Sequence, residues 1–271
     1  MEDPGKRLKI LTSNEIEELY GLPSFSNRDR AVYFSLDSLE KNELNYYRSI
    51  QTKVYFILQL GYFKAKRMFF TFDCLEVQED IQYIFHQYFF EENDKLTNLE
   101  ISKPTRLAQQ NHILKLLNYQ ICTKEIKERL QEKAYSIVVI YTKPIYIFKE
   151  LLNYLENNRI VIPGYSIMQL VVGKAITYEK NRLEAAVQQD INKDSQKALD
   201  KLLTAEDSLY ELTFLKREPR DFSYKEITIE VNKGESLKEL YHLACDFLPK
   251  LEISNENIKY LCLSCWVLHN L

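Results

Sequence analysis

The sequence has few of the residues that interrupt regular structure, with only 6 glycines and 7 prolines among 271 residues. Average usage would give about 7% glycine alone. This scarcity, combined with abundant leucine, lysine and glutamate, predicts a mostly helical protein. No apolar run approaches the roughly 18 residues of a transmembrane helix, so none is expected. The acidic start, residues 1–4, lacks the apolar core of a signal peptide.

Cysteine content and net charge set further limits. Five cysteines at irregular spacing suit a reducing cytosol better than a disulfide framework. The 36 basic and 39 acidic residues leave a net charge of −3, so any surface that binds nucleic acid has to be local. At 45% hydrophobic residues the chain can bury cores, and its length suffices for two or three small domains.

Start signals predict where several helices begin. The pairs Thr12 and Glu15, and Ser223 and Glu226, have the spacing of capping boxes, in which two residues three apart satisfy each other's backbone N–H groups. Asp37 with Glu40 gives another start signal. Asp73 and Thr123 open further helices. The apolar segment 49–60 predicts a central buried helix that ends at Gly61.

Two segments fit either a helix or a strand. Residues 137–140 are β-branched and could form a short strand, but they continue a helical pattern, so a helix is favoured. Ile227, Ile229 and Val231 alternate like a strand. The capping box before them favours a helix instead.

Polar, aperiodic residues at 91–102 and 192–195 mark two boundaries. They predict a first helical domain at 1–100 and a second at 101–192, with a helix-turn-helix at 145–182. Residues 193–271 would be a helical linker and the start of a further domain. The predicted fold class is all-α: consecutive small helical domains of helix-turn-helix type joined by helical connectors.

The segment 157–166 separates two amphipathic helical patterns. Ser166 and Gln169 have the spacing of a capping box, so the outline is a helix, a short Pro-Gly turn and a capped helix. An exposed helix N-terminus beside Arg159 and Tyr165 is suited to contact DNA, with Gln169 and Lys174 reading bases. The alternative is a plain αα-hairpin.

Two other segments mix cations with aromatic or amide side chains. The first, 63–70, contains Lys64, Lys66 and Arg67. It is either a phosphate-contacting segment or a charged loop that crosses a core. The second begins a helix, where backbone N–H groups can bind phosphate, unless it is an ordinary helix with a solvated face. It supplies Lys103, Thr105, Arg106, Gln109 and Gln110.

Signatures of catalysis are missing from the sequence: it has no nucleophile elbow, Walker loop or dinucleotide fingerprint. A two-metal nuclease would need carboxylates that converge from separate elements, which spacing cannot reveal. Cys262, Cys265 and His269 resemble part of a zinc site, but their helical spacing favours core cysteines. No catalytic residue, metal or cofactor is predicted.

Six segments together resemble the N-terminal region of the Tn-three family of replicative transposases. They follow the family's order along almost the whole chain. The segments are Leu11–Pro23, Gln59–Lys64, Arg106–Gln110, Lys143–Phe148, Arg159–Ser166 and Leu215–Pro219.

The resemblance implies helical domains that bind double-stranded DNA at the terminal inverted repeats of a transposon, in the bacterial cytoplasm. It also implies that the catalytic acidic triad lies downstream of this chain, so no enzymatic activity is expected. From residue 261 the sequence departs from the family's pattern, which suggests a truncated copy. The alternative is a helical module that pairs with full-length transposase and modulates it.

The expected DNA contacts combine the three segments. They are Lys64, Lys66, Arg67, Lys103, Thr105, Arg106, Gln109, Gln110, Arg159, Tyr165, Ser166, Gln169 and Lys174.

Overall fold

A computed structural model describes residues 8–89, 101–190 and 209–254, with positions 193, 196, 197, 200, 205 and 206 between them. Their regular secondary structure is helical, apart from one antiparallel pair of two-residue strands. The predicted all-α class is confirmed. The chain divides into two compact units, Met1–Ile137 with Lys143–Lys174, and Val138–Thr142 with Ala175–Leu271. The predicted division at residues 100 and 192 stays a prediction.

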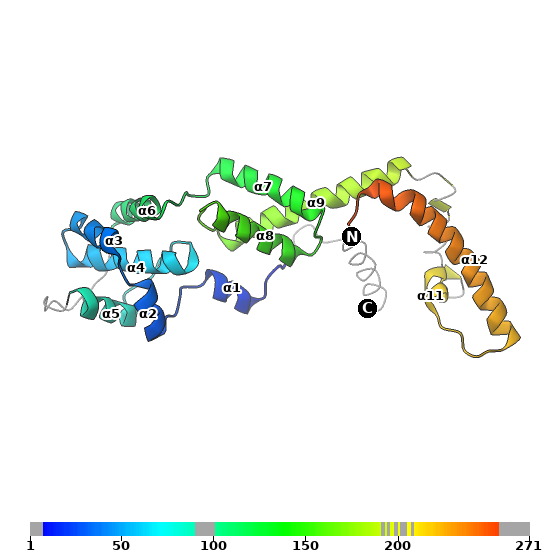
Figure 1. Cartoon of the computed structure of the whole chain (residues 1–271), viewed down its shortest axis with the longest axis horizontal. Coiled ribbons are helices and arrows are strands. Elements are labelled where there is room, and N and C mark those ends of the chain that lie inside the picture. Colours follow the sequence, from blue (N-terminus) through cyan, green and yellow to red (C-terminus); the bar gives the residue numbers. More distant parts are fainter. Residues whose placement is uncertain are drawn as a thin grey trace. The chain divides into compact units, whose positions relative to one another are not determined.

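The first unit is built from helices α1 to α9 (Figure 1). They are α1 (Ser13–Tyr20), α2 (Asn27–Tyr33), α3 (Ser38–Glu43), the 3-10 turn η1 (Leu44–Tyr46), α4 (Ile50–Lys66), α5 (Gln78–Tyr88), α6 (Lys103–Leu117), α7 (Lys124–Val138), α8 (Pro144–Asn157) and α9 (Tyr165–Asp190). The two units divide at Lys174, within α9.

The second unit contains the rest of α9 and the elements that follow it. They are β1 (Ala205–Glu206), β2 (Leu209–Tyr210), α11 (Glu211–Lys216), α12 (Tyr224–Phe247) and the 3-10 turn η2 (Leu248–Leu251). Residues 227–231 lie inside α12, so the helical interpretation of that segment is confirmed.

Side-chain caps fix where the first helices begin. The predicted box between Thr12 and Glu15 forms, and the start signal at Asp37 and Glu40 is a second capping box. Ser26 and Asp29 form a third box, at the start of α2. Such caps satisfy backbone N–H groups that the first helical turn leaves without partners.

Helix α4 is the centre of the first core. All ten of its residues from Val54 to Phe63 are buried, and α2, α5 and α6 pack against it (Figure 1). The prediction that α4 ends at Gly61 was wrong, because the helix continues to Lys66. A Cβ atom at Gly61 would lie 2.4 Å from the Phe34 ring. This glycine therefore permits close helix packing rather than a helix end.

A buried ionic group ties α2, α4 and α5 together. Arg30 Nε donates to Asp80 Oδ1 at 2.6 Å, and the Tyr62 hydroxyl donates to Asp80 Oδ2 at 2.6 Å. Burial and the Asp80 carboxylate both raise the pKa of Tyr62, which keeps its hydroxyl a proton donor. Each carboxylate oxygen thus has a donor, as a buried charge requires.

Two helix boundaries differ from the predictions. Helix α5 begins at Gln78 rather than at Asp73, because the Asp73 side chain accepts backbone N–H groups from Leu75 and Glu76 and closes a separate turn first. Helix α7 ends at Val138, so residues 139 and 140 form a turn rather than the predicted continuation of the helix. Strong local hydrogen bonds can compete with helix extension in this way.

Candidate nucleic-acid interface

The connection between α8 and α9 runs over residues 158–164 and is longer than a tight helix-turn-helix turn of three or four residues. Its backbone is hydrogen-bonded to two other helix ends. The Gln120 N–H donates to Arg159 O at 2.9 Å, and the Val161 N–H donates to Gln120 O at 3.0 Å. The Ile162 N–H donates to Arg67 O at 3.1 Å. The start of α9 is therefore held by the ends of α4 and α6.

Arg159, in this connection, adopts the left-handed backbone conformation with φ of 50°. Its guanidinium donates to Leu117 O at 3.4 Å, although the residue is exposed. Cations near the end of a helix interact favourably with its last carbonyl groups. Part of the hydrogen-bonding capacity of Arg159 is thus used to close α6.

The predicted cap at Ser166 was wrong. Helix α9 begins at Tyr165, and the Gly164 carbonyl accepts the first helical N–H groups, from Ile167 at 2.9 Å and Met168 at 3.3 Å. Ser166 is already inside the helix. An N-cap residue needs a non-helical backbone, which the residue before Tyr165 supplies instead. Ser166 is exposed and does not cap the helix.

Tyr165 and Gln169 bind the N-terminal segment of the chain. The Tyr165 hydroxyl accepts the N–H groups of Ile10 and Leu11 at 3.3 and 3.1 Å. Gln169 Nε2 donates to Leu8 O at 3.0 Å. Both side chains are half-buried. They bring the segment before α1 against the first turn and a half of α9.

The basic segment 64–67 is turned inward. Lys64 Nζ donates to Glu40 Oε2 at 2.7 Å and to Ser35 O at 3.1 Å. Lys66 donates to the carbonyl of Glu18. Arg67 ends α4 in the left-handed conformation, and its guanidinium donates to Phe63 O at 3.3 Å. Lys64 thus pairs with a buried acid, whereas Lys66 and Arg67 bind backbone carbonyls near helix ends.

The segment at the start of α6 is divided between surface and core. Lys103 is exposed, whereas Thr105, Arg106 and Gln110 are half-buried. Gln109 is fully buried, and its amide donates to Thr52 O at 2.8 Å. A base edge could not reach the Gln109 amide in this arrangement.

His112, one turn further along α6, has a similar structural setting. Its Nδ1 lies 2.8 Å from the Tyr47 hydroxyl, and its Nε2 pairs with Glu43. Burial raises the pKa of Tyr47, and the nearby Glu43 carboxylate raises it further. This group links α6 to α3 and η1.

A set of exposed cations that the motifs did not single out lies on α7 and α8. Residues 101–174 contain eleven lysines and arginines but only five acidic residues, a net charge of +6. A windowed charge count would have detected this excess within a chain that is acidic overall. The exposed members on these helices are Lys124, Lys127, Arg129, Lys133 and Lys149.

The cations of α7 are not neutralised within the protein. In the described ranges, no ion pair involves Lys124, Lys127, Arg129 or Lys133. The same is true of Lys103 and Lys174. Positive charge on α6, α7 and α9 therefore faces solvent, where it can meet phosphate.

One face of α9 is solvent-exposed along the part that belongs to the first unit. Ser166, Leu170 and Lys174 are exposed at intervals of four residues, so they share that face. Leu170 is 58% exposed. The opposite face packs inward through Met168, Val171 and Val172. A hydroxyl, an apolar side chain and a cation in one row form a surface that could contact base edges.

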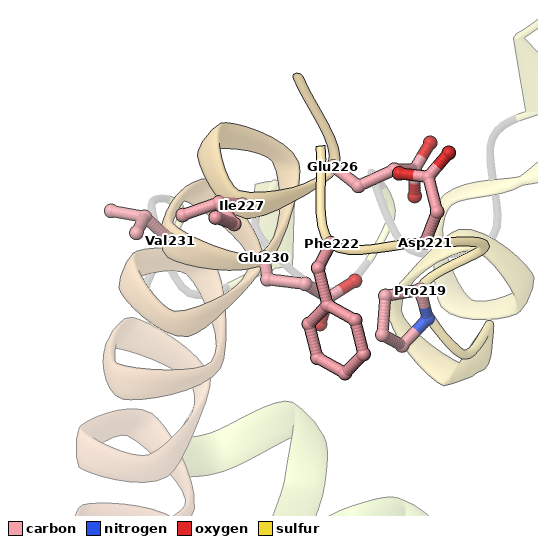
Figure 2. A pocket seen from close by; sticks show the side chains of 7 residues that line it. All are labelled: Pro219, Asp221, Phe222, Glu226, Ile227, Glu230 and Val231. Atoms are coloured by element: carbon pink, nitrogen blue, oxygen red, sulfur yellow. The ribbon is translucent and has the colours of Figure 1, made fainter. Parts of the chain in front are cut away.

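The second unit has a groove of about 340 Å³ beside the start of α12 (Figure 2). Pro219 and Phe222 come from the preceding loop, and Ile227 and Val231 come from two successive turns of α12. Acidic side chains complete the lining: Asp221, Glu226 and Glu230.

Two further kinds of site, a metal centre and a membrane span, are absent from the described residues. They contain no cluster of three or more histidine, cysteine, aspartate or glutamate side chains that could hold a metal ion. None of their helices is long and apolar enough to cross a membrane. The Cys262, Cys265 and His269 group lies outside the described residues.

Residues 10–175 match the family described as a domain of unknown function, DUF4158. Because this match covers more than half of the chain, the chain belongs to that family. The matched region corresponds closely to the first unit and includes the connection before α9. A comparison with curated proteins finds no match.

Proposed function

We propose that the DUF4158 region of this chain binds double-stranded DNA through α7, α9 and the start of α6. The observation that carries this proposal is the distribution of charge: residues 101–174 have a net charge of +6, and the cations of α7 are exposed without ion pairs in the described structure. Neutralising DNA phosphates releases counterions and supplies most of the affinity in such complexes.

Two groups of residues would make different contacts, one with DNA phosphates and the other with base edges. Lys103, Lys124, Lys127, Arg129 and Lys133 would neutralise phosphates, which positions the protein without reading sequence. The exposed row on α9, Ser166, Leu170 and Lys174, would face base edges in the major groove. Gln109 is left out of this proposal because it is buried.

The finer proposal is that the DNA is the terminal inverted repeat of a transposon, recognised as in the Tn-three family of transposases. Five of the six motif segments that carry this resemblance lie within residues 10–175, the span of the DUF4158 match. The family match gives no activity of its own, so the resemblance alone supports the choice of target.

Fluorescence anisotropy with labelled duplexes tests both levels of the proposal. Binding to any duplex, with affinity that falls steeply as salt rises, supports the DNA-binding function. Tighter binding to the element's terminal repeat than to a scrambled duplex supports end recognition. Lys174→Ala should weaken binding to the repeat, whereas Lys41→Ala, an exposed lysine on α3, serves as the matched control. No measurable binding to either duplex would contradict the proposal.

A second candidate function is a protein-interaction module that pairs with full-length transposase. The observation in its favour is an exposed apolar row on α12, comprising Tyr224, Ile227, Val231 and Tyr241, each at least 52% exposed. Exposed apolar patches of this kind mark association surfaces. Size-exclusion chromatography of the chain mixed with full-length transposase tests it. A complex that Ile227→Asp and Val231→Asp abolish is expected, and separate elution of the two proteins would rule it out.

A further inference from the structure

The exposed face of α12 has an apolar row that is symmetric about one glycine. Ile227 and Val231 precede Gly234 by seven and three positions, and Leu237 and Tyr241 follow it by three and seven. Intervals of three and four residues keep these positions on one side of a helix. The four side chains are between 50% and 65% exposed. The row therefore reads the same from either end of the helix, apolar at each step.

A different side of α12 faces its own unit. Lys233 is 4% exposed, and its ammonium group donates to Arg217 O at 2.5 Å. Ile229, Leu240 and Leu243 are half-buried. The apolar row is thus not the side that holds α12 in the second unit. Apolar side chains that gather on one exposed face mark an association surface.

The glycine at the centre of the row has no packing role within the chain. Glycine inside a helix is less favourable than alanine, and a Cβ atom at Gly234 would meet no described atom within 4 Å. Packed helix axes lie roughly 8–10 Å apart, with Cα atoms about 2.3 Å from each axis. Facing Cα atoms then lie roughly 3.4–5.4 Å apart. A glycine at the crossing point permits the shorter end of this range.

The charges along the row match their own reverse order. In an antiparallel pairing of two α12 helices about Gly234, residues equally distant from it oppose each other. Lys238 then faces Glu230, and His242 faces Glu226. Glu230 already pairs with Lys233 at 2.5 Å, but its side chain is 39% exposed and can accept a second cation. A parallel pairing would instead put Lys238 against Lys238, which costs association energy.

We propose that the exposed row of α12 is a homodimer surface on which the same helix of a second copy of this chain lies antiparallel. Ile227 of one copy would pack against Tyr241 of the other, and Val231 against Leu237. Such a two-fold contact is isologous, so each pair of residues occurs twice. The surface overlaps the α12 row of the second candidate function, but its occupant is a second copy. The proposal does not rest on DNA binding.

Sedimentation equilibrium of the full chain between about 1 and 200 µM tests the association, a range suited to a micromolar dissociation constant. We expect a monomer–dimer equilibrium. Leu237→Asp should weaken it at least about 10-fold, because it places a charge in the apolar contact. Thr228→Asp, at an exposed position on another side of α12, is the matched control and should change it less than about 2-fold.

Charge reversal tests the antiparallel direction of the pairing. Lys238→Glu would oppose Glu230 of the other copy at two places in each dimer, so association should weaken about 10-fold. Lys225→Glu makes the same change at an exposed position outside the row. It should change association less than about 2-fold. Circular dichroism of each variant verifies that it is folded.

A cysteine at the centre of the row tests the register. Disulfides need Cα atoms roughly 4.4–6.8 Å apart, a distance that only a residue near the two-fold axis has from its own copy. Under mild oxidation Gly234→Cys should therefore form a reducible dimer. The unchanged chain, which controls for the native cysteines, and Glu239→Cys, exposed on another side of α12, should not.

Three outcomes would overturn the proposal. A chain that stays monomeric at every concentration has no such surface, even if it forms a complex with full-length transposase, and that complex would support the second candidate function instead. A dimer that Leu237→Asp leaves intact uses another face. A dimer in which Gly234→Cys forms no disulfide lacks the antiparallel register. None of these results affects the proposed DNA binding, which anisotropy measures separately.

Discussion

Several cations in the first half of the first unit are placed in the opposite way to the cations of α7 in the second half. In residues 8–89, Arg30 and Lys64 are committed to buried acids, and Lys66 and Arg67 donate to backbone carbonyls. In residues 101–174, the cations of α7 face solvent without ion pairs in the described structure. The number of cations in a motif therefore does not identify a DNA-binding surface. What matters is whether the fold already engages the charged groups in ion pairs or hydrogen bonds.

The largest expected effect concerns the paired half. Asp80→Ala leaves Arg30 without its buried partner and should destabilise the fold by about 3–5 kcal/mol. Glu79→Ala is the matched control, because Glu79 pairs with the same arginine but its side chain is 80% exposed. Its loss should cost at most about 1 kcal/mol. Urea unfolding followed by circular dichroism measures both, and equal losses would contradict a buried, structural pairing.

Glycine substitutions compare the packing of the two halves. Gly61→Ala forces a Cβ into the Phe34 ring and should cost about 1–3 kcal/mol. Gly173→Ala, in α9, meets no atom within 4 Å and should stabilise the helix by about 0.5–1 kcal/mol. Thermal unfolding should show shifts of opposite sign. A stabilising Gly61→Ala would show that α2 and α4 are less closely packed than described.

Charge removal on the two halves should affect DNA binding unequally. Lys127→Ala with Lys133→Ala removes two exposed charges and should lower the salt slope by about two units. Lys64→Met with Lys66→Met removes two committed charges and should leave the slope unchanged while lowering thermal stability. Anisotropy titrations between about 50 and 200 mM salt measure the slopes. Equal slopes for the two double variants would remove the distinction between the halves.

The smallest expected effect is the acid dependence of the α1 cap. Hydrogen bonds from the Thr12 backbone and side chain lower the pKa of Glu15. A lowered pKa in the folded state stabilises the fold above the unfolded value, about 4.3, and this contribution is lost as pH falls through the folded pKa. Glu15→Gln should therefore lower the melting temperature slightly at pH 7 and have no effect in acid. A difference that persists in acid would mean that charge is not the cause.

Local signals were readable from the sequence because their partners are close along the chain. The capping boxes at Thr12 and Asp37 join residues three apart, and both form. Ser166 shows the limit of such signals. It had the right spacing, but Gly164 supplies the first helical acceptor, and Gln169 binds Leu8 instead. Spacing identifies a possible cap and cannot exclude a distant competitor.

Long-range pairings decided the rest of the candidate site and left no local pattern. Arg30 and Asp80 are 50 residues apart, and Leu11 and Tyr165 are 154 apart. Gln109 looked like a surface amide by its polar neighbours, yet it is buried against α4. By contrast, the exposed cations of α7 could have been found from the sequence, because the net charge of residues 101–174 is positive. The motifs drew attention to conspicuous clusters and away from an evenly spread excess of charge.

Lysine footprinting tests the central claim most directly. The chain, alone and saturated with duplex DNA, is treated with an amine-acetylating reagent, and each lysine is quantified by mass spectrometry. We expect DNA to protect Lys103, Lys124, Lys127, Lys133 and Lys174 while Lys41 and Lys53 react equally in both states. Bound DNA that protects Lys41 and Lys53, and leaves the lysines of α7 as reactive as before, would contradict the account.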